Sequence, residues 1–297
     1  MSLIQTVLLG FIAGVTILLG LPIGRLRTAT PTLSALLNAT AVGVLLFLFW
    51  DVLSVAWAPI DDALTSAHEG KGGLGAAAGY GLLFGGGLAV GLLALVYYES
   101  WMARQLLHVG APGASPGGHG PGAMGVSEVK ARRHNRLANW SAARRLSLLI
   151  AMGIGLPNFA EGLAIGQSAA SGKLALALPL VIGFGLHNAT ESFGIVPPHQ
   201  RYRRRGQPAC AELGLPAGDG RHRGGPTFLG TPVGHQFTSE AVSVVFLTLA
   251  AGSILYVVTR LIAVANKARR ADLLAYGLLL GLLAGFLTDA IVTAAGA

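Results

Sequence analysis

The chain has 297 residues, of which 53% are hydrophobic and only 11% charged, and its mean hydropathy is +0.61. Soluble domains carry about 25% charged residues, so this composition excludes an ordinary soluble domain and indicates an integral membrane protein. The single cysteine, Cys210, excludes a framework of intramolecular disulfides. The net charge of +8 lies between apolar runs rather than on one basic face, which argues against nucleic acid as a partner.

Seven apolar segments are long enough to cross about 30 Å of hydrocarbon as helices. In chain order they cover residues 4–24, 33–58, 76–98, 146–170, 174–197, 241–262 and 271–294. No basic residue precedes the first segment, so we interpret it as a retained helix rather than a cleaved signal peptide. An eighth candidate, 224–237, is short and rich in glycine and proline, and a broken or half-length helix is an alternative for it.

The basic residues favour eight spans with both termini outside. In that arrangement 19 of the 21 lysines and arginines lie on the inner side, and only Lys71 and Lys173 lie outside. Seven spans would move the last inner loop outward and weaken the asymmetry that the positive-inside rule predicts. The sequence therefore predicts an all-α integral membrane protein with one membrane domain over residues 1–297. We expect it to cross the cell membrane eight times.

Two connections differ from the rest of the chain. Residues 102–145 are expected to form a flexible cytoplasmic loop. Its histidines (His108, His119 and His134) either collect metal weakly or belong to a solvated linker. Residues 199–223 hold six arginines and Cys210. This atypical basic segment is either a native loop or the product of a local shift of reading frame in the coding sequence.

Spans four and five carry ionisable and amide side chains at bilayer depth, where such groups are costly and are functional candidates. Span four contains Gly155-Leu-Pro-Asn-Phe-Ala-Glu-Gly162, and span five contains Gly185-Leu-His-Asn-Ala-Thr-Glu-Ser192. Glycine, leucine, asparagine and glutamate recur at the same offsets in the two segments. A short loop near Lys173 joins the helices, so we expect them to be antiparallel neighbours.

These side chains fall on common helix faces. Glu191 follows His187 by four residues and Asn188 by three, and Glu161 follows Asn158 by three. If the faces meet, they offer one imidazole, two carboxylates and two carboxamide oxygens, which is a ligand set for a divalent transition metal. The alternative is that the polar groups only hydrogen-bond between helices, which explains a single asparagine better than the repeated set.

With this pair of motifs the chain resembles the ZIP (Zrt/Irt-like) family of divalent metal transporters. The segments PNFAEG (157–162) and HNATES (187–192) are similar to the family's HNxPEG motifs in spans four and five. The later segment GGPTFLG…LAAGSILYVV resembles the family's spans six and seven. The resemblance implies a ZIP-like bundle of eight spans with outside termini. It also implies that the metal ligands are His187, Glu191, Glu161, Asn188 and Asn158.

The chain departs from the family motif at several positions. Pro157 replaces the span-four histidine, Ala160 and Thr190 replace the motif prolines, and Ser192 replaces a closing glycine. Near the start of span six, where the family often supplies a carboxylate, this chain has Gly225. One imidazole fewer makes the site harder, so iron(II) and manganese become alternatives to zinc. Pro157 either kinks the helix or also frees a carbonyl for a passing ion.

The resulting hypothesis is a transporter and not an enzyme. It carries zinc, iron or manganese toward the cytoplasm and holds no prosthetic group. The expected partners are divalent metal ions and the lipid bilayer, and a monomer and a homodimer both remain open. No GxxxxGK[ST] motif for nucleotide binding occurs in the chain. Two other functions remain open: an intramembrane zinc-dependent hydrolase, and a proton-linked carrier of an organic solute that uses Glu161 and Glu191.

Four further acidic residues lie in or near the spans. Asp51 either lines the transport route or sits at the membrane interface, and Asp289 either lines the route or packs helices together. Glu99 and Glu240 lie near span ends, where we expect them to be solvated.

Overall fold

The computed structural model describes residues 1–24, 31–107, 142–186, 188, 215–266 and 270–296. These residues form helices and no strand. The helices are α1 (Leu3–Gly24), α2 (Pro31–His68), α3 (Leu74–Leu107), α4 (Ala142–Ala170), α6 (Leu215–His235), α7 (Glu240–Asn266) and α8 (Ala271–Ala294). A further apolar helix, Leu174–Leu186, follows α4. The expectation of an all-α fold is confirmed.

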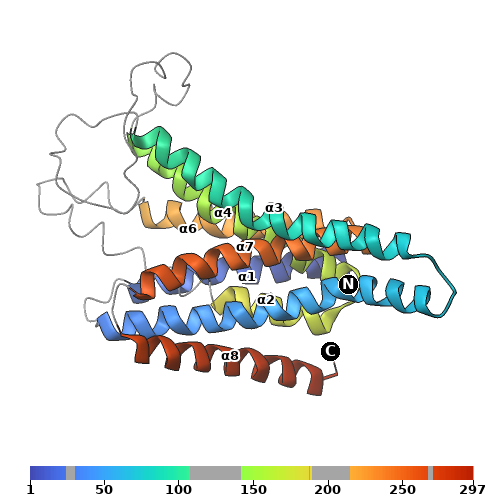
Figure 1. Cartoon of the computed structure of the whole chain (residues 1–297). Helices are drawn as coiled ribbons and strands as arrows, with labels where there is room; N and C mark the ends of the chain where they lie inside the picture. Colours follow the sequence, from blue (N-terminus) through green and yellow to red (C-terminus); the bar gives the residue numbers. More distant parts are fainter. Residues whose placement is uncertain (25–30, 108–141, 187, 189–214, 267–269, 297) are drawn as a thin grey trace, which may run out of the picture.

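The helices lie side by side, and successive helices run in opposite directions (Figure 1). Both chain termini are therefore at the same end of the bundle. The opposite end carries the C-terminus of α3 and the N-termini of α4 and α6. This end-to-end alternation is the arrangement that a polytopic membrane bundle requires.

Four of the described helices are long and apolar enough to cross a membrane: Ala35–His68, Leu74–Trp101, Glu240–Ala263 and Ala271–Ala294. Large apolar side chains remain exposed along whole faces of this bundle. On α8 they include Leu279, Leu283, Phe286 and Ile291. A soluble domain rarely exposes such continuous apolar surface, whereas lipid covers it in a membrane. The protein is therefore a membrane-embedded helical bundle.

Glycine closes two of the tight turns. α2 and α4 are each followed, two residues after their last helical residue, by a glycine with positive φ, which is 72° at Gly70 and 75° at Gly172. After Gly172, the Lys173 amide donates to the Ser168 carbonyl at 2.9 Å, and the Gly172 amide donates to Ala169 at 3.3 Å. This pair of bonds is a Schellman motif, which stops a helix and satisfies its last carbonyls. The turn at Gly172 reverses the chain, so the Leu174–Leu186 helix runs in the direction opposite to α4, as the sequence predicts (Figure 1).

Glycines also let three pairs of helices approach closely. A Cβ atom added to Gly91 of α3 would lie 3.1 Å from the Cα of Gly252 of α7. One added to Gly43 of α2 would lie 2.8 Å from the Cα of Gly281 of α8. The third pair is α4 with α6, described with the site below. Small residues at crossings of this kind give packed membrane helices their van der Waals contact.

Two helix boundaries differ from the predicted spans. α2 continues through Pro59 to His68, past the predicted end at residue 58. Hydropathy marks where apolar residues stop, whereas helical hydrogen bonding continues through the polar residues that follow. α6 is one 21-residue helix that contains Pro226 and Pro232. It begins at Leu215, inside the segment predicted as an inner loop, and it is not broken.

The core lies where α2, α4, α7 and the Leu174–Leu186 helix meet. Its largest fully buried side chains include Leu45, Leu48, Ile165, Phe184 and Ile254. Because this core is apolar, any polar group that enters it must be satisfied by a neighbour or a ligand.

Candidate metal site

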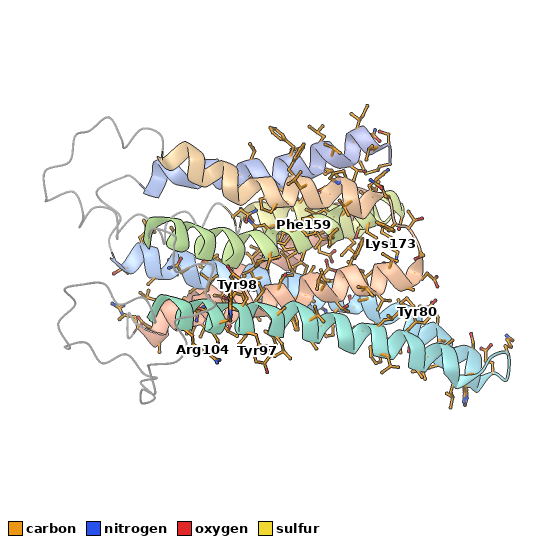
Figure 2. All side chains as sticks on the ribbon, turned by 90° about the horizontal axis from the view of Figure 1, so that it is seen from above. Tyr80, Tyr97, Tyr98, Arg104, Phe159 and Lys173 are labelled. Carbon is orange, nitrogen blue, oxygen red and sulfur yellow. The ribbon has the colours of Figure 1, made fainter. Side chains whose placement is uncertain are left out.

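The span-four pair is buried inside the bundle. Asn158 is 2% exposed and Glu161 is 1% exposed. Both stand on α4, one turn apart, so their side chains share a face as the sequence predicts. Phe159, between them, lies between Arg104 and Lys173 along the bundle (Figure 2). The pair therefore lies well inside the bundle and away from both ends.

The described member of the span-five motif, Asn188, is also fully buried. Its side-chain nitrogen donates to the backbone carbonyl of Ala13 in α1 at 3.2 Å. This bond joins segments 175 residues apart in the chain. It gives Asn188 an interhelical bonding role, and it uses the amide nitrogen. A metal would use the carboxamide oxygen.

The packing of α4 against α6 shows which residues of the two helices lie at the same level along the bundle axis. A Cβ added to Gly162 would contact the Thr227 carbonyl and lie 3.0 Å from the Cα of Gly230. One added to Gly155 would lie 3.4 Å from Pro226. The two helices run in the same direction (Figure 1). Thr227 therefore lies at the level of Glu161 and Gly162.

Packing of α1 against α6 shows which residue of α1 lies at the level of Thr227. The rings of Phe11 and Phe228 are 6.3 Å apart, and Gly10 contacts the side chain of Thr231. The two helices run in opposite directions, so one further turn of α1 brings Ala13 to the level of Thr227. Since Ala13 holds Asn188, the contacts bring Asn158, Glu161, Asn188 and Thr227 into one layer of the bundle.

We call these four residues the polar layer. They come from α4, from the end of the helix that follows it, and from α6. At this level the layer contains one carboxyl group, two carboxamides and one hydroxyl, and all four residues are at least 98% buried. Oxygen donors of this kind suit a hard or borderline divalent cation.

Thr227 was missed by the sequence analysis. A threonine in an apolar helix is common, and its hydroxyl normally bonds to a carbonyl of its own helix. The signal that distinguishes Thr227 is tertiary: its hydroxyl is completely buried and makes no hydrogen bond with the described residues, whereas the equally buried hydroxyl of Thr231 donates to the Thr227 carbonyl. No feature of the sequence would have separated it from Thr231 four residues later.

The other two predicted ligands, His187 and Glu191, lie outside the described residues. Within the described part of the chain, no three His, Cys, Asp or Glu side chains come together as a metal-binding group. The loop histidines His108, His119 and His134 lie outside it as well.

Glu99 and Glu240, near the ends of their helices, bond to side chains of neighbouring helices and are not part of the polar layer. Glu99 of α3 accepts a hydrogen bond from the Tyr256 hydroxyl of α7 at 3.0 Å and also pairs with Arg260. Glu240 accepts a bond from the Tyr80 hydroxyl at 3.2 Å. The expected solvation holds for Glu240, which is exposed, whereas Glu99 is half-buried, and each carboxylate also has a hydrogen-bonding partner on a neighbouring helix. Each was within reach of a tyrosine on the neighbouring helix, which the one-dimensional pattern cannot reveal.

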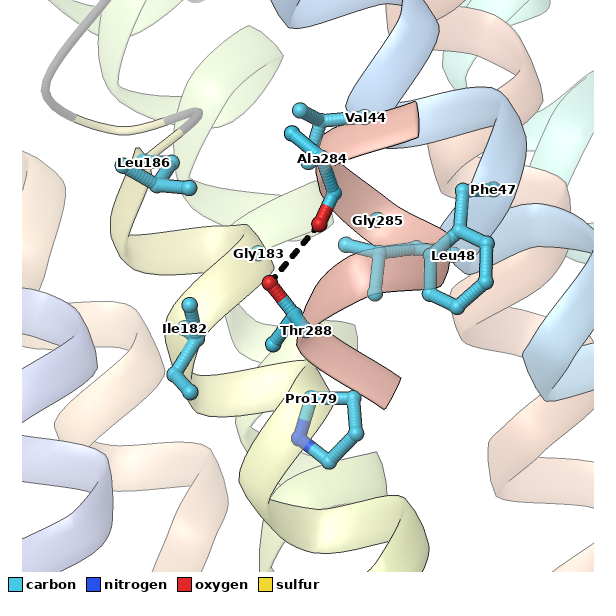
Figure 3. Close-up of a pocket in the computed structure, with 10 residues that line it drawn as sticks. All are labelled: Val44, Phe47, Leu48, Pro179, Ile182, Gly183, Leu186, Ala284, Gly285 and Thr288. Atoms are coloured by element: carbon cyan, nitrogen blue, oxygen red, sulfur yellow. Dashed lines mark hydrogen bonds between the residues drawn. The ribbon is translucent and has the colours of Figure 1, made fainter. Parts of the chain in front are cut away.

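A small cavity lies between α2, α8 and the Leu174–Leu186 helix (Figure 3). It holds about 10 Å³, and apolar residues such as Phe47, Leu48 and Ile182 line most of it. The hydroxyl of Thr288 is its polar group, and this hydroxyl donates to the Ala284 carbonyl at 2.8 Å. A cavity with so few polar partners does not suit an ion.

No family model matches the sequence, and no curated protein matches it significantly.

Proposed function

We propose that the protein is a carrier of divalent transition-metal ions, and that the polar layer is part of its metal site. The observation that carries this proposal is the burial of Asn158, Glu161 and Asn188 in one layer of an apolar membrane bundle. The repeated Asn-x-x-Glu motif contributes two of these residues from span four and one from span five. The same motif supports the resemblance to ZIP transporters.

The complete site would add His187 and Glu191. An imidazole and a second carboxylate would then join the oxygen donors of the polar layer, which is a set that suits zinc, iron(II) or manganese. The metal is the cargo and not a resident cofactor, so the site must release it again. Protonation of a carboxylate is one way to weaken the site for release.

Eight spans with both termini outside form part of the proposal. The alternation of helix directions and the shared end of the two termini support an even number of crossings. The described basic side chains support the orientation: Arg104 lies at the proposed inner end and Lys173 at the other (Figure 2). Transport then runs toward the cytoplasm, down the metal gradient, in the cell membrane.

Uptake by proteoliposomes tests this function. Purified protein is reconstituted, and entry of radioactive zinc and manganese is followed under an inward metal gradient. Glu161→Gln keeps the shape of the side chain and removes the ligand charge, so we expect it to lower uptake by at least about tenfold. Glu240→Gln is the matched control, because Glu240 lies at a helix end and bonds to Tyr80.

Wild-type uptake no faster than leakage into protein-free liposomes would refute metal transport. Wild-type uptake with an unaffected Glu161→Gln variant would instead refute the site. His187→Ala and Glu191→Ala extend the test to the two ligands outside the described residues. We expect both to lower uptake at least as much as Glu161→Gln.

A further inference from the structure

The hydroxyl of Thr227 differs from the other buried threonine hydroxyls in the described part of the chain. Those of Thr6, Thr231 and Thr248 each donate to a carbonyl one turn earlier, at 3.1, 2.8 and 2.6 Å. Such back-bonding is the usual way for a hydroxyl to be satisfied within a membrane helix. Thr227 Oγ1 is equally buried and makes no hydrogen bond with the described residues.

An unsatisfied hydroxyl in an apolar core costs roughly 1–3 kcal/mol, so it suggests a partner other than the described residues. Thr227 lies in the polar layer, at the level of Glu161 and Gly162. A backbone contact with α4 holds it there, because the Thr227 carbonyl packs against Gly162. Any larger residue at position 162 would push α6 away from this level.

We propose that Thr227 Oγ1 is a ligand of the transported ion, contributed by α6, and that it favours hard cations. This inference rests on the proposed function and adds a specificity-determining residue to it. A hydroxyl oxygen prefers manganese or iron(II) to the softer cadmium ion. It also gives α6 a direct part in a site otherwise built from span four and span five.

Three variants test the proposal in proteoliposomes. Thr227→Val is close to isosteric and removes only the hydroxyl oxygen, whereas Thr227→Ser retains it. Thr248→Val is the matched control, since Thr248 is also 0% exposed but bonds to its own helix and packs against Gly87 of α3. We expect Thr227→Val to raise the KM for manganese about tenfold and the KM for cadmium less than about threefold. Thr227→Ser and Thr248→Val should stay close to wild type.

Thr227→Cys gives an independent test, because it predicts a gained preference for cadmium rather than a loss of manganese transport. A thiolate is a soft ligand, so this variant should raise the preference for cadmium over manganese by at least about tenfold. The experiment uses a Cys210→Ser background, which leaves position 227 as the single cysteine. If Thr227→Val does not fold, the Ser and Cys variants still decide the question.

Two outcomes must be kept apart. If the wild-type protein moves no divalent metal, the proposed function fails. If it moves metal, and both the KM values of Thr227→Val and the selectivity of Thr227→Cys equal those of wild type, then only the role of Thr227 is overturned. A loss of uptake in Thr248→Val as large as that in Thr227→Val would also overturn it, because the effect would then come from losing any buried hydroxyl.

Discussion

Polar side chains enter the apolar bundle in two ways. Most of the buried hydroxyls, such as those of Thr231, Thr248 and Ser253, donate to carbonyls of their own helices and need no external partner. A smaller set, which includes Glu161 and Asn188, is fully buried in the polar layer inside the apolar bundle. Helix stability alone does not require the second set, since an apolar side chain would pack there without a desolvation cost. Function is the better reason for it.

Asp51 of α2 carries a half-buried carboxyl group outside the polar layer. Its Oδ2 atom is buried and makes no hydrogen bond with the described residues, and Asp289 of α8 is close enough to act on it electrostatically. Two neighbouring carboxyl groups in low dielectric are unfavourable when both are charged. The pair lies between α2 and α8, two helices that already pack closely through Gly43 and Gly281.

We expect Asp51→Asn to stabilise the protein by about 1 kcal/mol, because it replaces a half-buried carboxyl group that lies beside a second carboxyl group, Asp289, with a neutral amide. The measurement is thermal unfolding in detergent, with Asp289→Asn and the double variant alongside. The double variant should gain little beyond either single change, since one substitution already relieves the repulsion. Unchanged metal uptake would identify the pair as a packing feature. A drop in uptake with the gain in stability would place Asp51 on the ion's route.

At the scale of elements, α3 with α7 and α2 with α8 use the same packing device. Gly87 and Gly91 of α3 contact Thr248 and Gly252 of α7. With the same four-residue spacing, Gly277 and Gly281 of α8 contact Ala39 and Gly43 of α2. The two pairs therefore correspond to each other.

The correspondence extends two turns further along the helices. There the α3–α7 pair holds Glu99 with Arg260, and the α2–α8 pair holds Asp289 with Asp51. Equivalent positions thus hold an acid–base pair between α3 and α7 and two acidic residues between α2 and α8.

Glycine-to-alanine substitutions in α3 test the α3–α7 crossing, because we expect them to destabilise the protein at the crossing and to stabilise it away from the crossing. Gly91→Ala places a methyl group 3.1 Å from the Gly252 Cα and against the Leu249 carbonyl, so we expect a loss of about 1–3 kcal/mol. Gly86 has no neighbouring atom within 4 Å. Gly86→Ala should therefore raise stability by up to about 1 kcal/mol through helix propensity. Unfolding in sodium dodecyl sulfate measures both changes, and equal effects would argue against the α3–α7 crossing.

At the scale of the whole molecule, the described charges and the helix directions agree with the proposed topology of eight spans and outside termini. Lys71 and Lys173 lie in turns at the end that carries both termini, and Arg270 lies at the opposite end, between α7 and α8. All three side chains are exposed. This distribution is the one expected if the end with the termini faces outward.

Single cysteines test this topology in intact cells. In a Cys210→Ser background we place them at Gly73, Ser171 and Arg270, all of which lie between helices. A maleimide that cannot cross the membrane should label positions 73 and 171 directly. It should label position 270 only after the membrane is permeabilised. Labelling of 270 in intact cells would contradict eight spans with outside termini.

The sequence by itself determined the membrane character, most helix positions and the candidate residues in spans four and five. These features are local: an apolar run marks a span, and a three- or four-residue spacing puts Asn158 and Glu161 on one face. It also indicated the hairpin around Lys173, because only three residues separate α4 from the next helix.

Only the tertiary structure decided the continuous helix at α6, the partners of Glu99 and Glu240, and the position of Thr227. α6 has two internal prolines and weak hydropathy, so its stability depends on close glycine packing against α4. The hydroxyl of Thr227 becomes distinctive only in the folded bundle, where it is completely buried and makes no hydrogen bond with the described residues. Burial and partnership depend on residues far apart in the chain, and a pattern within one segment carries no information about them.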